Sequence, residues 1–187
     1  MRYAQDHKAQ THQRILHEAS ARFRRDGIGA TGLQPLMKAL GLTHGGFYAH
    51  FKSKDDLVEK ALRCAVDESR ERTAPVFAEE NALEKYIDFY LSEGHRSNPD
   101  KGCPLPTMSC ELGQRGQPSP ITDELILARL DSLKNTLSGP DAEAQSMMMM
   151  STMVGALMLS RSVQDPELSD RILATAREWL KKTPSEA

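Results

Sequence analysis

Short apolar stripes with helical spacing run through almost the whole chain, and they set the fold class. Ile15, Leu16, Ala19 and Phe23 form one such stripe, and Gly27 follows it as a helix stop. Comparable stretches continue to the C-terminal end, and none of them shows the alternation that is typical of a β-strand. The sequence therefore predicts an all-α protein of about nine helices.

Cap residues indicate where several of these helices begin. Thr31 opens a T-x-x-Q capping box, Thr43 can cap a very short helix, and Ser53 precedes a long helix with acidic residues in its first turn. The last two helices share another start signal, at residues 139–141 and 165–167. Each of these triplets offers a cap, a proline at the expected first helical position and an acidic residue.

The charges are distributed unevenly along the 187 residues. Residues 1–54 hold nine Lys and Arg against three Asp and Glu, a net charge of +6, whereas residues 55–187 carry a net charge of −8. Five of the six histidines also precede residue 55. A basic N-terminal unit on an acidic body indicates a polyanionic partner at that end. The alternative is an ordinary solvated helical surface.

Several classes of protein are disfavoured. The chain has no run of 18 apolar residues and no apolar core of a signal peptide near its start, so we expect a cytoplasmic protein without a membrane partner. Cys64, Cys103 and Cys110 show no C-x-x-C spacing, which favours free thiols over disulfides or a zinc site.

We also expect no metal, cofactor or catalytic residue. His7, His12 and His17 are spaced by five, so they diverge around a helix and make a poor metal site. His95 and Cys103 are the one conceivable nucleophile pair, but nothing in the sequence brings them together or adds a third partner. An enzyme is therefore not expected.

The second and third predicted helices have the layout of a helix-turn-helix. Leu36, Leu40, Leu42 and Phe47 would form its buried corner, with Gly41 at the sharp turn. A recognition helix must bring its first residues into the DNA major groove. The residues offered there are Thr43, His44, Gly45, Gly46, Tyr48 and His50. The two glycines would let the backbone approach bases or phosphates closely.

The stretch GLTHGGFYAHFKSKDDL, residues 41–57, resembles the helix-turn-helix signature of the TetR/AcrR transcriptional regulators, and it meets every fixed position of that pattern. The resemblance implies a helix-turn-helix DNA-binding domain of three helices, which we assign to residues 1–52. It also implies a helical effector-binding and dimerisation domain, which we assign to residues 53–187.

The resemblance also implies roles for single residues. Tyr48, His50 and Lys54 match phosphate-contacting positions, and Thr43 and His44 match positions that face the groove. Gln34 matches a position that can reach a base edge, whereas Phe47 and Phe51 match packing positions. The second helix departs from the family pattern, because Gly32 stands where a threonine is common and Pro35 where an acidic residue is common.

A dimer interface is predicted in the last two helices. Residues 147–160 are apolar nearly all round, so this helix needs cover on both sides. Two such helices from each of two chains would make a four-helix interface around a two-fold axis, as the resemblance also implies. Its candidate residues are Met153, Leu157, Leu168, Ile172, Ala176 and Trp179. The alternative is a monomer whose penultimate helix is fully internal.

An effector pocket is predicted between the middle helices. Tyr86 and Tyr90 can offer hydroxyls in an apolar cavity, and Cys103, Leu105 and Met108 are its other candidate lining residues. Cys103 has a second interpretation, because it precedes the apparent start of a helix and lies near a lysine. Both features favour the reactive thiolate, so Cys103 is either a sensor of electrophiles or oxidants or an inert buried residue.

Together these patterns predict a homodimeric transcriptional regulator that responds to a small-molecule effector. We expect a repressor that releases a palindromic double-stranded DNA operator when the effector binds the C-terminal domain. The alternative outside this class is a helical small-molecule-binding or enzymatic protein with no DNA role. The alternative inside it is a regulator that senses electrophiles or oxidants through a cysteine.

Overall fold

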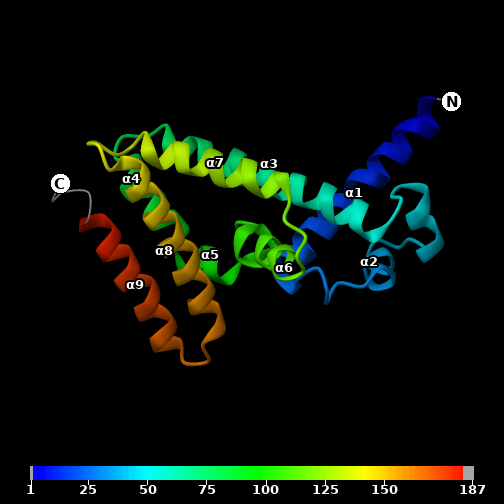
Figure 1. The fold of residues 1–187 in the computed structure, drawn as a ribbon. Coiled ribbons are helices and arrows are strands. Elements are labelled where there is room, and N and C mark those ends of the chain that lie inside the picture. Colours follow the sequence, from blue (N-terminus) through cyan, green and yellow to red (C-terminus); the bar gives the residue numbers. More distant parts are fainter. Residues whose placement is uncertain (1, 183–187) are drawn as a thin grey trace.

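The computed structural model describes residues 2–182, and every regular element within them is helical, as predicted. These residues form nine α-helices and three short 3-10 or π-helical segments, and Figure 1 shows how they are arranged. Their bounds are α1 (Arg2–Asp26), α2 (Leu33–Ala39), η1 (His44–Ala49), α3 (Lys54–Phe77), α4 (Ala82–Tyr90), α5 (Glu93–Ser97), η2 (Pro99–Lys101), η3 (Leu105–Ser109), α6 (Cys110–Gln114), α7 (Pro120–Lys134), α8 (Ala142–Ser162) and α9 (Pro166–Lys182).

The helices form two groups that share α3. At one end of the molecule α1 and α2 lie with η1 against the start of α3, and at the other end α8 and α9 form an antiparallel hairpin (Figure 1). Helix α7 lies side by side with α3 and packs on α8. We call α1, α2 and η1 the head, and the segments from α4 to α9 the body. Helix α3 belongs to both.

The head is built around the predicted stripe of α1. Ile15, Ala19 and Phe23 are fully buried against the apolar face of α3. Gly27 ends α1 with a φ of +89°, and Gly41 turns the chain between α2 and η1 with a φ of +72°. Both values lie in the left-handed region that favours glycine, which explains these two positions.

Helix α2 begins later than its predicted capping box. The Thr31 hydroxyl does not cap α2 but donates to the Gly27 carbonyl at 2.7 Å, at the end of α1. Gly32 takes the cap position without a side-chain bond, and the first helical bond runs from the Leu36 N–H to the Gly32 carbonyl. Pro35 then lies in the first turn, where its missing N–H removes no helical bond.

Three other caps form as predicted. The Thr43 hydroxyl accepts from the Gly46 N–H at 3.2 Å, and the Ser53 hydroxyl accepts from the Asp56 N–H at 3.1 Å. Helix α9 begins at Pro166, behind an Asp165 carboxylate that caps it. The matching proline of α8, at residue 140, lies before the helix instead of at its first position.

The body contains several short breaks between its helices. Ser92 separates α4 from α5, because its hydroxyl donates to the Phe89 carbonyl at the end of α4 and accepts from the His95 N–H at the start of α5. A π-helical turn, η3, likewise precedes α6.

The hydropathy of the helices bears on the membrane question. None of the helices described between residues 2 and 182 combines the length and the apolar character that a bilayer-spanning helix requires.

Candidate DNA-binding surface and ligand cavity

Segment η1 buries one residue, Phe47, and leaves most of its other residues exposed to solvent. Phe47 is fully buried in the head, whereas its neighbour Tyr48 is 61% exposed. The centroid of the Tyr48 ring lies 5.2 Å from that of Phe47 and 6.0 Å from that of His44, in edge-to-face contacts. Both neighbours therefore help to hold the Tyr48 ring in place. We call the outward-facing residues of this region the reading surface: Gln34, Thr43, His44, Gly45, Gly46 and Tyr48.

The two glycines of η1 leave room that the chain itself does not fill. A Cβ atom at Gly45 would have no neighbour within 4 Å, and one at Gly46 would meet only the Thr43 hydroxyl, at 3.4 Å. Packing inside the protein therefore requires neither glycine. What their missing side chains provide is open space in front of the η1 backbone, through which an outside molecule can approach its N–H groups.

His50 lies at the edge of the reading surface and is half-buried. Its Nδ1 is buried and has no hydrogen-bond partner among the residues whose side chains the structure describes, and its ring centroid lies 6.1 Å from that of His12. Burial lowers the pKa of His50, and the nearby His12 and Lys8 lower it further. A neutral His50 would carry its proton on Nε2, the nitrogen that can still find a partner.

Lys54 does not point freely into solvent. Its ammonium donates to the Thr31 carbonyl at 2.7 Å and so ties the start of α3 to the start of α2. Burial lowers the pKa of Lys54, and the charge of Arg115 adds to this effect. A phosphate contact by Lys54 remains a prediction, and it would require this internal hydrogen bond to break or to be shared.

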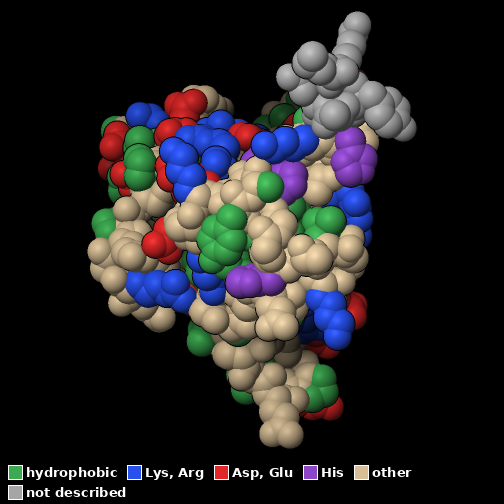
Figure 2. Space-filling view, turned by 90° about the vertical axis from the view of Figure 1, so that its right-hand side faces the viewer, with side chains coloured by type: hydrophobic (Ala, Val, Ile, Leu, Met, Phe, Trp, Pro, Cys, Tyr) green, Lys and Arg blue, Asp and Glu red, His purple; other side chains and the backbone are tan. Residues whose placement is uncertain are grey.

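Figure 2 looks onto the head end of the molecule. Lys, Arg and His side chains gather on this face, while Asp and Glu side chains lie mostly towards its margins. The excess of basic residues in the N-terminal part of the sequence therefore appears as a basic face at the head end of the molecule. Such a face favours a polyanion.

A cavity of about 420 Å³ opens between α3, α4 and the segment from α5 to Cys103. It is lined by Ser69, Arg72, Thr73, Tyr86, Phe89, Tyr90, Ser92, Gly94, His95, Asn98, Lys101, Gly102 and Cys103. Tyr86, Tyr90 and Cys103 therefore lie where the sequence predicts an effector pocket. Leu105 and Met108 do not line the cavity, because the π-helical turn of η3 buries them against α1 and α8.

His95 is the central cavity residue that the sequence does not reveal. Its Nδ1 lies 2.7 Å from the Tyr90 carbonyl, and the Cys103 N–H donates to its Nε2 at 3.0 Å. Since a carbonyl only accepts, Nδ1 carries the proton and the ring is neutral. Burial lowers the pKa of His95 to about 4. His95 and Cys103 do meet, but through the Cys103 backbone, which provides no nucleophile pair.

The Tyr90 hydroxyl is the unsatisfied group of the cavity. Tyr90 is 4% exposed, and its hydroxyl has no hydrogen-bond partner in the part of the chain that the structure describes. Burial raises its pKa well above the usual value, and Cys103 adds to this effect. A buried hydroxyl without a partner is costly unless a ligand or water satisfies it.

Two cations line the same cavity. Arg72 and Lys101 have no ion pair within 4 Å among the described residues, because the Glu68 carboxylate is held by Arg24 and His17. On the far side of Tyr86, the buried Arg129 stacks over the ring at 4.9 Å. The cavity wall thus combines aromatic surface with positive charge and one free hydroxyl.

Several bonds join the head to the body. The Glu111 carboxylate of α6 accepts from the Ile28 and Gly29 N–H groups, at 2.6 and 2.8 Å, in the turn after α1. Arg24 of α1 is 3% exposed and donates to the Gly102 carbonyl at 3.3 Å and to Glu68 at 2.5 Å. The cavity wall is therefore bonded directly to the head.

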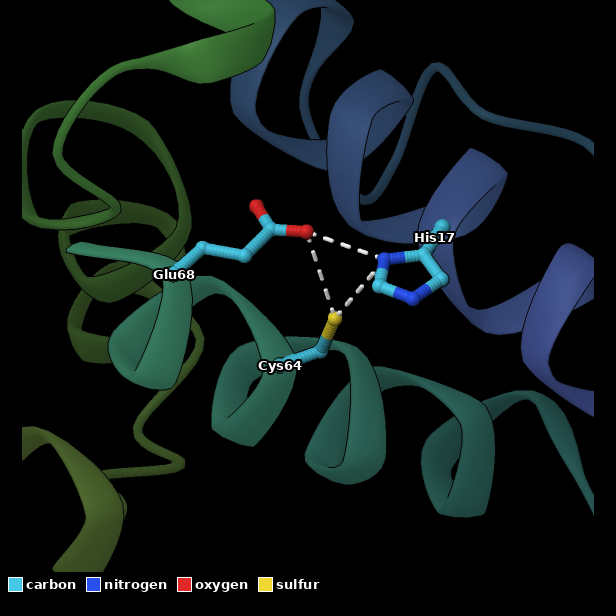
Figure 3. Close-up of side chains that lie close together, drawn as sticks. All are labelled: His17, Cys64 and Glu68. Carbon is cyan, nitrogen blue, oxygen red and sulfur yellow. Dashed lines mark hydrogen bonds and ion pairs between the residues drawn. The ribbon is translucent and has the colours of Figure 1, made fainter. Parts of the chain in front are cut away.

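One group of side chains within residues 6–182 has the spacing of metal ligands. His17 of α1 meets Cys64 and Glu68 of α3 at the joint between the two helices (Figure 3). The sequence argument against a metal site compared histidines along a single helix, so it could not find a cluster formed across two helices.

The predicted dimer residues fall into two sets. Met153 and Leu157 are 1% and 0% exposed and pack within their own chain, so they are not available to a partner and that assignment is corrected. Leu168, Ile172 and Ala176 are half-buried on α9, and Trp179 is 52% exposed. Apolar residues occur on all sides of α8, so its sequence has no helical periodicity that would mark the side facing the core.

A different side of α8 faces outward beside α9. Met148 and Leu159 are 60% and 58% exposed. A groove of about 590 Å³ runs between the two helices, lined by Thr152, Gly155, Ala156, Leu159, Arg171, Ile172, Thr175, Ala176 and Trp179. We call these groove residues, together with Met148, the α8–α9 face. Apolar surface of this kind typically marks a protein contact.

Comparison with known proteins finds a family resemblance in the N-terminal part of this chain. Residues 15–61 match the family described as "Bacterial regulatory proteins, tetR family". The HTH-type transcriptional regulator AcrR of Shigella flexneri is 44% identical over 48 residues, which are 26% of this chain. The match spans only 22% of the length of AcrR.

Solved structures extend the likeness of fold to nearly the whole chain. A TetR transcriptional regulator from Chloroflexus aurantiacus has a TM-score of 0.74 at 23% identity, covering 97% of this chain and 98% of that one. The reduced form of E. coli NemR has a TM-score of 0.74 at 18% identity, covering 92% and 96%.

Proposed function

We infer that this chain, which belongs to the tetR family of bacterial regulatory proteins through its residues 15–61, is a DNA-binding transcriptional regulator. The observation that carries the proposal is the reading surface. Tyr48 is 61% exposed on a segment whose other side, Phe47, is fully buried. An element that reads a DNA groove requires one side that is packed firmly in the protein and another side that exposes polar residues to the DNA.

On DNA, we assign the contacts by position. Thr43, His44 and the open backbone at Gly45 would face base edges, and Gln34 would reach a further base from α2. Tyr48 and the Nε2 of His50 would donate to phosphates. The division into a DNA-binding domain, residues 1–52, and an effector-binding domain, residues 53–187, belongs to the same proposal, with α3 starting in one and ending in the other.

We propose that the protein acts as a homodimer through the α8–α9 face. Met148, Leu159 and Trp179 are large hydrophobic residues that are 60%, 58% and 52% exposed on this face, and exposed apolar patches often mark protein interaction sites. A two-fold pairing of the α8–α9 hairpins would bury this face and present two heads to one DNA duplex. The operator would then be an inverted repeat.

The cavity supports a response to a small molecule. Its volume of about 420 Å³ falls within the range of ligand pockets, and its wall includes the aromatic rings of Tyr86, Phe89 and Tyr90. The free Tyr90 hydroxyl and the unpaired Arg72 favour an effector with an apolar body and a hydrogen-bond acceptor or negative charge at one end. Effector binding would weaken the operator complex, so the protein would act as a repressor.

A second mode of response is favoured by the position of Cys103. This residue is half-buried in the cavity wall, beside the Tyr90 ring and close to Lys101. A cavity ligand that is an electrophile would meet the thiol there. The test is release of DNA by an electrophile from the wild type and from Cys64→Ser and Cys110→Ser, but not from Cys103→Ser. Equal release from Cys103→Ser leaves reversible binding as the mechanism.

Selection of bound DNA from a random pool tests the main proposal. We expect a recovered inverted repeat whose affinity falls steeply as salt rises. Transcription from a promoter carrying this site, with and without the protein, then separates a repressor from an activator. Failure to enrich any sequence, together with turnover of a cavity ligand, would establish the alternative of a helical enzyme without a DNA role.

A further inference from the structure

The cluster at the joint of α1 and α3 brings together three different donor atoms. His17 Nδ1 lies 3.0 Å from Glu68 Oε1 and 3.5 Å from Cys64 Sγ, and Cys64 Sγ lies 3.6 Å from the same Glu68 oxygen. Figure 3 shows all three side chains pointing at one another across the gap between the two helices. The donors are an imidazole nitrogen, a sulfur and a carboxylate oxygen.

These separations can be compared with the edges of a metal coordination tetrahedron. Zinc bonds of about 2.3 Å to sulfur and about 2.0–2.2 Å to nitrogen and oxygen imply S–N and S–O edges of about 3.6 Å and an N–O edge of about 3.4 Å. Both edges to sulfur agree with this geometry. The nitrogen–oxygen edge is shorter by about 0.4 Å, which a small side-chain rotation removes.

We propose that His17, Cys64 and Glu68 form a binding site for one divalent transition metal ion, with Zn²⁺ as the ion that their N, S and O donors suit best. Calcium and magnesium are disfavoured, because they prefer sites made only of oxygen ligands. Three protein ligands leave a fourth tetrahedral corner, which water fills on the solvent side, where His17 is exposed.

The surroundings fit this role. A recess of about 350 Å³ that borders His17 and Glu68 gives an ion access from solvent. Arg24 donates to the other oxygen of Glu68, Oε2, at 2.5 Å, and so orients Oε1 towards the position that the ion would take. With two anionic ligands the ion is neutralised, and Arg24 leaves one positive charge at the site.

Binding changes the protonation of Cys64. In the free protein the Cys64 thiol donates to Glu68 Oε1 at 3.6 Å. Metal coordination replaces the S–H bond by an S–metal bond and releases one proton to solvent, while the oxidation states stay unchanged.

Bound metal would tie the head to α3. His17 belongs to α1 of the head, and Cys64 and Glu68 belong to the middle of α3. Glu68 is bonded through Arg24 to the Gly102 carbonyl in the cavity wall. A metal ion would fix the end of this chain of contacts, and it would do so whether or not the protein binds DNA.

Cobalt titration of the chelator-treated, full-length protein tests the proposal without DNA. One equivalent of Co²⁺ should give a near-ultraviolet charge-transfer band from the Co–thiolate bond, and Zn²⁺ should displace it. Cys64→Ser should lose this band, and His17→Ala should weaken Co²⁺ binding by at least tenfold. The matched controls Cys110→Ser and His7→Ala should titrate as the wild type does.

Thermal unfolding gives a second measurement. A hundredfold excess of Zn²⁺ over its Kd should raise the wild-type melting temperature by about 5 °C or more, and should leave Cys64→Ser unchanged. Absence of the charge-transfer band, or its loss in Cys103→Ser instead of Cys64→Ser, would overturn the site. A Cys64→Ala variant that still binds Co²⁺ as the wild type does would overturn it as well.

Discussion

The reading surface and the α8–α9 face both expose large side chains, but with opposite chemistry. On the reading surface, Tyr48 carries a hydroxyl and sits among histidines and open backbone. On the α8–α9 face, Met148, Leu159 and Trp179 expose mostly apolar atoms. The polar groups of the reading surface are well solvated when no DNA is bound. The apolar side chains of the α8–α9 face are more stable when a protein partner buries them. We therefore expect transient binding at one and permanent pairing at the other.

The largest expected effect comes from placing a charge on the α8–α9 face. Trp179→Glu should convert a dimer into monomers and lower operator affinity by about 100-fold or more, because each head then binds alone and loses the avidity of two linked sites. Sedimentation at micromolar concentration and operator titration measure the two effects.

Leu127→Glu provides the matched control for this change. Leu127 is 66% exposed on α7, away from the α8–α9 face, so this variant should remain dimeric and bind DNA normally. A wild-type protein that sediments as a monomer would remove the contrast between the two surfaces.

The next effect separates the two neighbouring aromatic residues of η1. Phe47→Ala should lower the free energy of unfolding by about 3–5 kcal/mol, because it empties a fully buried site. Tyr48→Ala should change it by less than about 0.5 kcal/mol and still weaken operator binding about tenfold. Urea unfolding and fluorescence anisotropy of labelled operator measure both. Equal losses of unfolding free energy in Phe47→Ala and Tyr48→Ala would contradict the assignment of Phe47 to the buried side of η1 and of Tyr48 to its exposed side.

Acid should destabilise the body through His95, whose pKa shift is large, although burial also lowers the pKa of His50 in the head. The pKa of His95 is about 4 when folded and about 6.5 when unfolded, so the unfolded chain binds the extra proton between these values. Its stabilisation is full above about pH 6.5 and is lost as the pH falls towards 4. Between pH 7 and 5 the loss amounts to about 2 kcal/mol.

Urea unfolding at pH 7 and pH 5 measures this loss, with two glutamine variants for comparison. His95→Gln should show a smaller decrease than the wild type, because the amide does not take up a proton. His44→Gln, which changes an exposed histidine of the head, should keep the full decrease. The same decrease in both variants would place the acid sensitivity elsewhere.

The smallest effect compares one helix cap in each region. Thr43→Ala and Asp165→Ala should each lower the free energy of unfolding by about 1 kcal/mol, since each removes one cap bond. Only Thr43→Ala should also weaken operator binding, because its helix carries the reading surface. A loss of operator affinity in Asp165→Ala, at temperatures where this variant stays folded, would contradict the claim that only the cap of η1 affects DNA binding.

The head could be predicted from the sequence because its signals are local. Gly27, Gly41, Thr43 and Ser53 act within three or four residues of their own positions, and each ends or caps a helix as expected. Thr31 is the exception, because the carbonyl left free at the end of α1 competes for its hydroxyl. That competitor belongs to the preceding helix, which a capping pattern does not include.

The body could not be predicted as well because its decisive contacts are distant or degenerate. The bond between His95 and the Cys103 N–H depends on the turns of α5 and η2 between them. In α8, four consecutive methionines give no periodicity, and the side that faces the core includes the fully or almost fully buried Ser146 and Ser160. Pattern reading therefore identified an apolar helix but did not reveal which of its sides faces the core of its own chain.

Helix α3 is in effect a lever arm between the cavity and the head. Its 24 residues span about 36 Å, with Ser69, Arg72 and Thr73 at the cavity and Lys54 bonded to the start of α2 at the other end. A tilt of about 5° at the cavity end displaces the head end by about 3 Å, close to the 3.4 Å rise of one base pair. In a two-fold pair the displacements of the two heads add. A movement that leaves the packing around a ligand intact would then change the distance between the two heads, so that it no longer matches the spacing of successive turns of DNA.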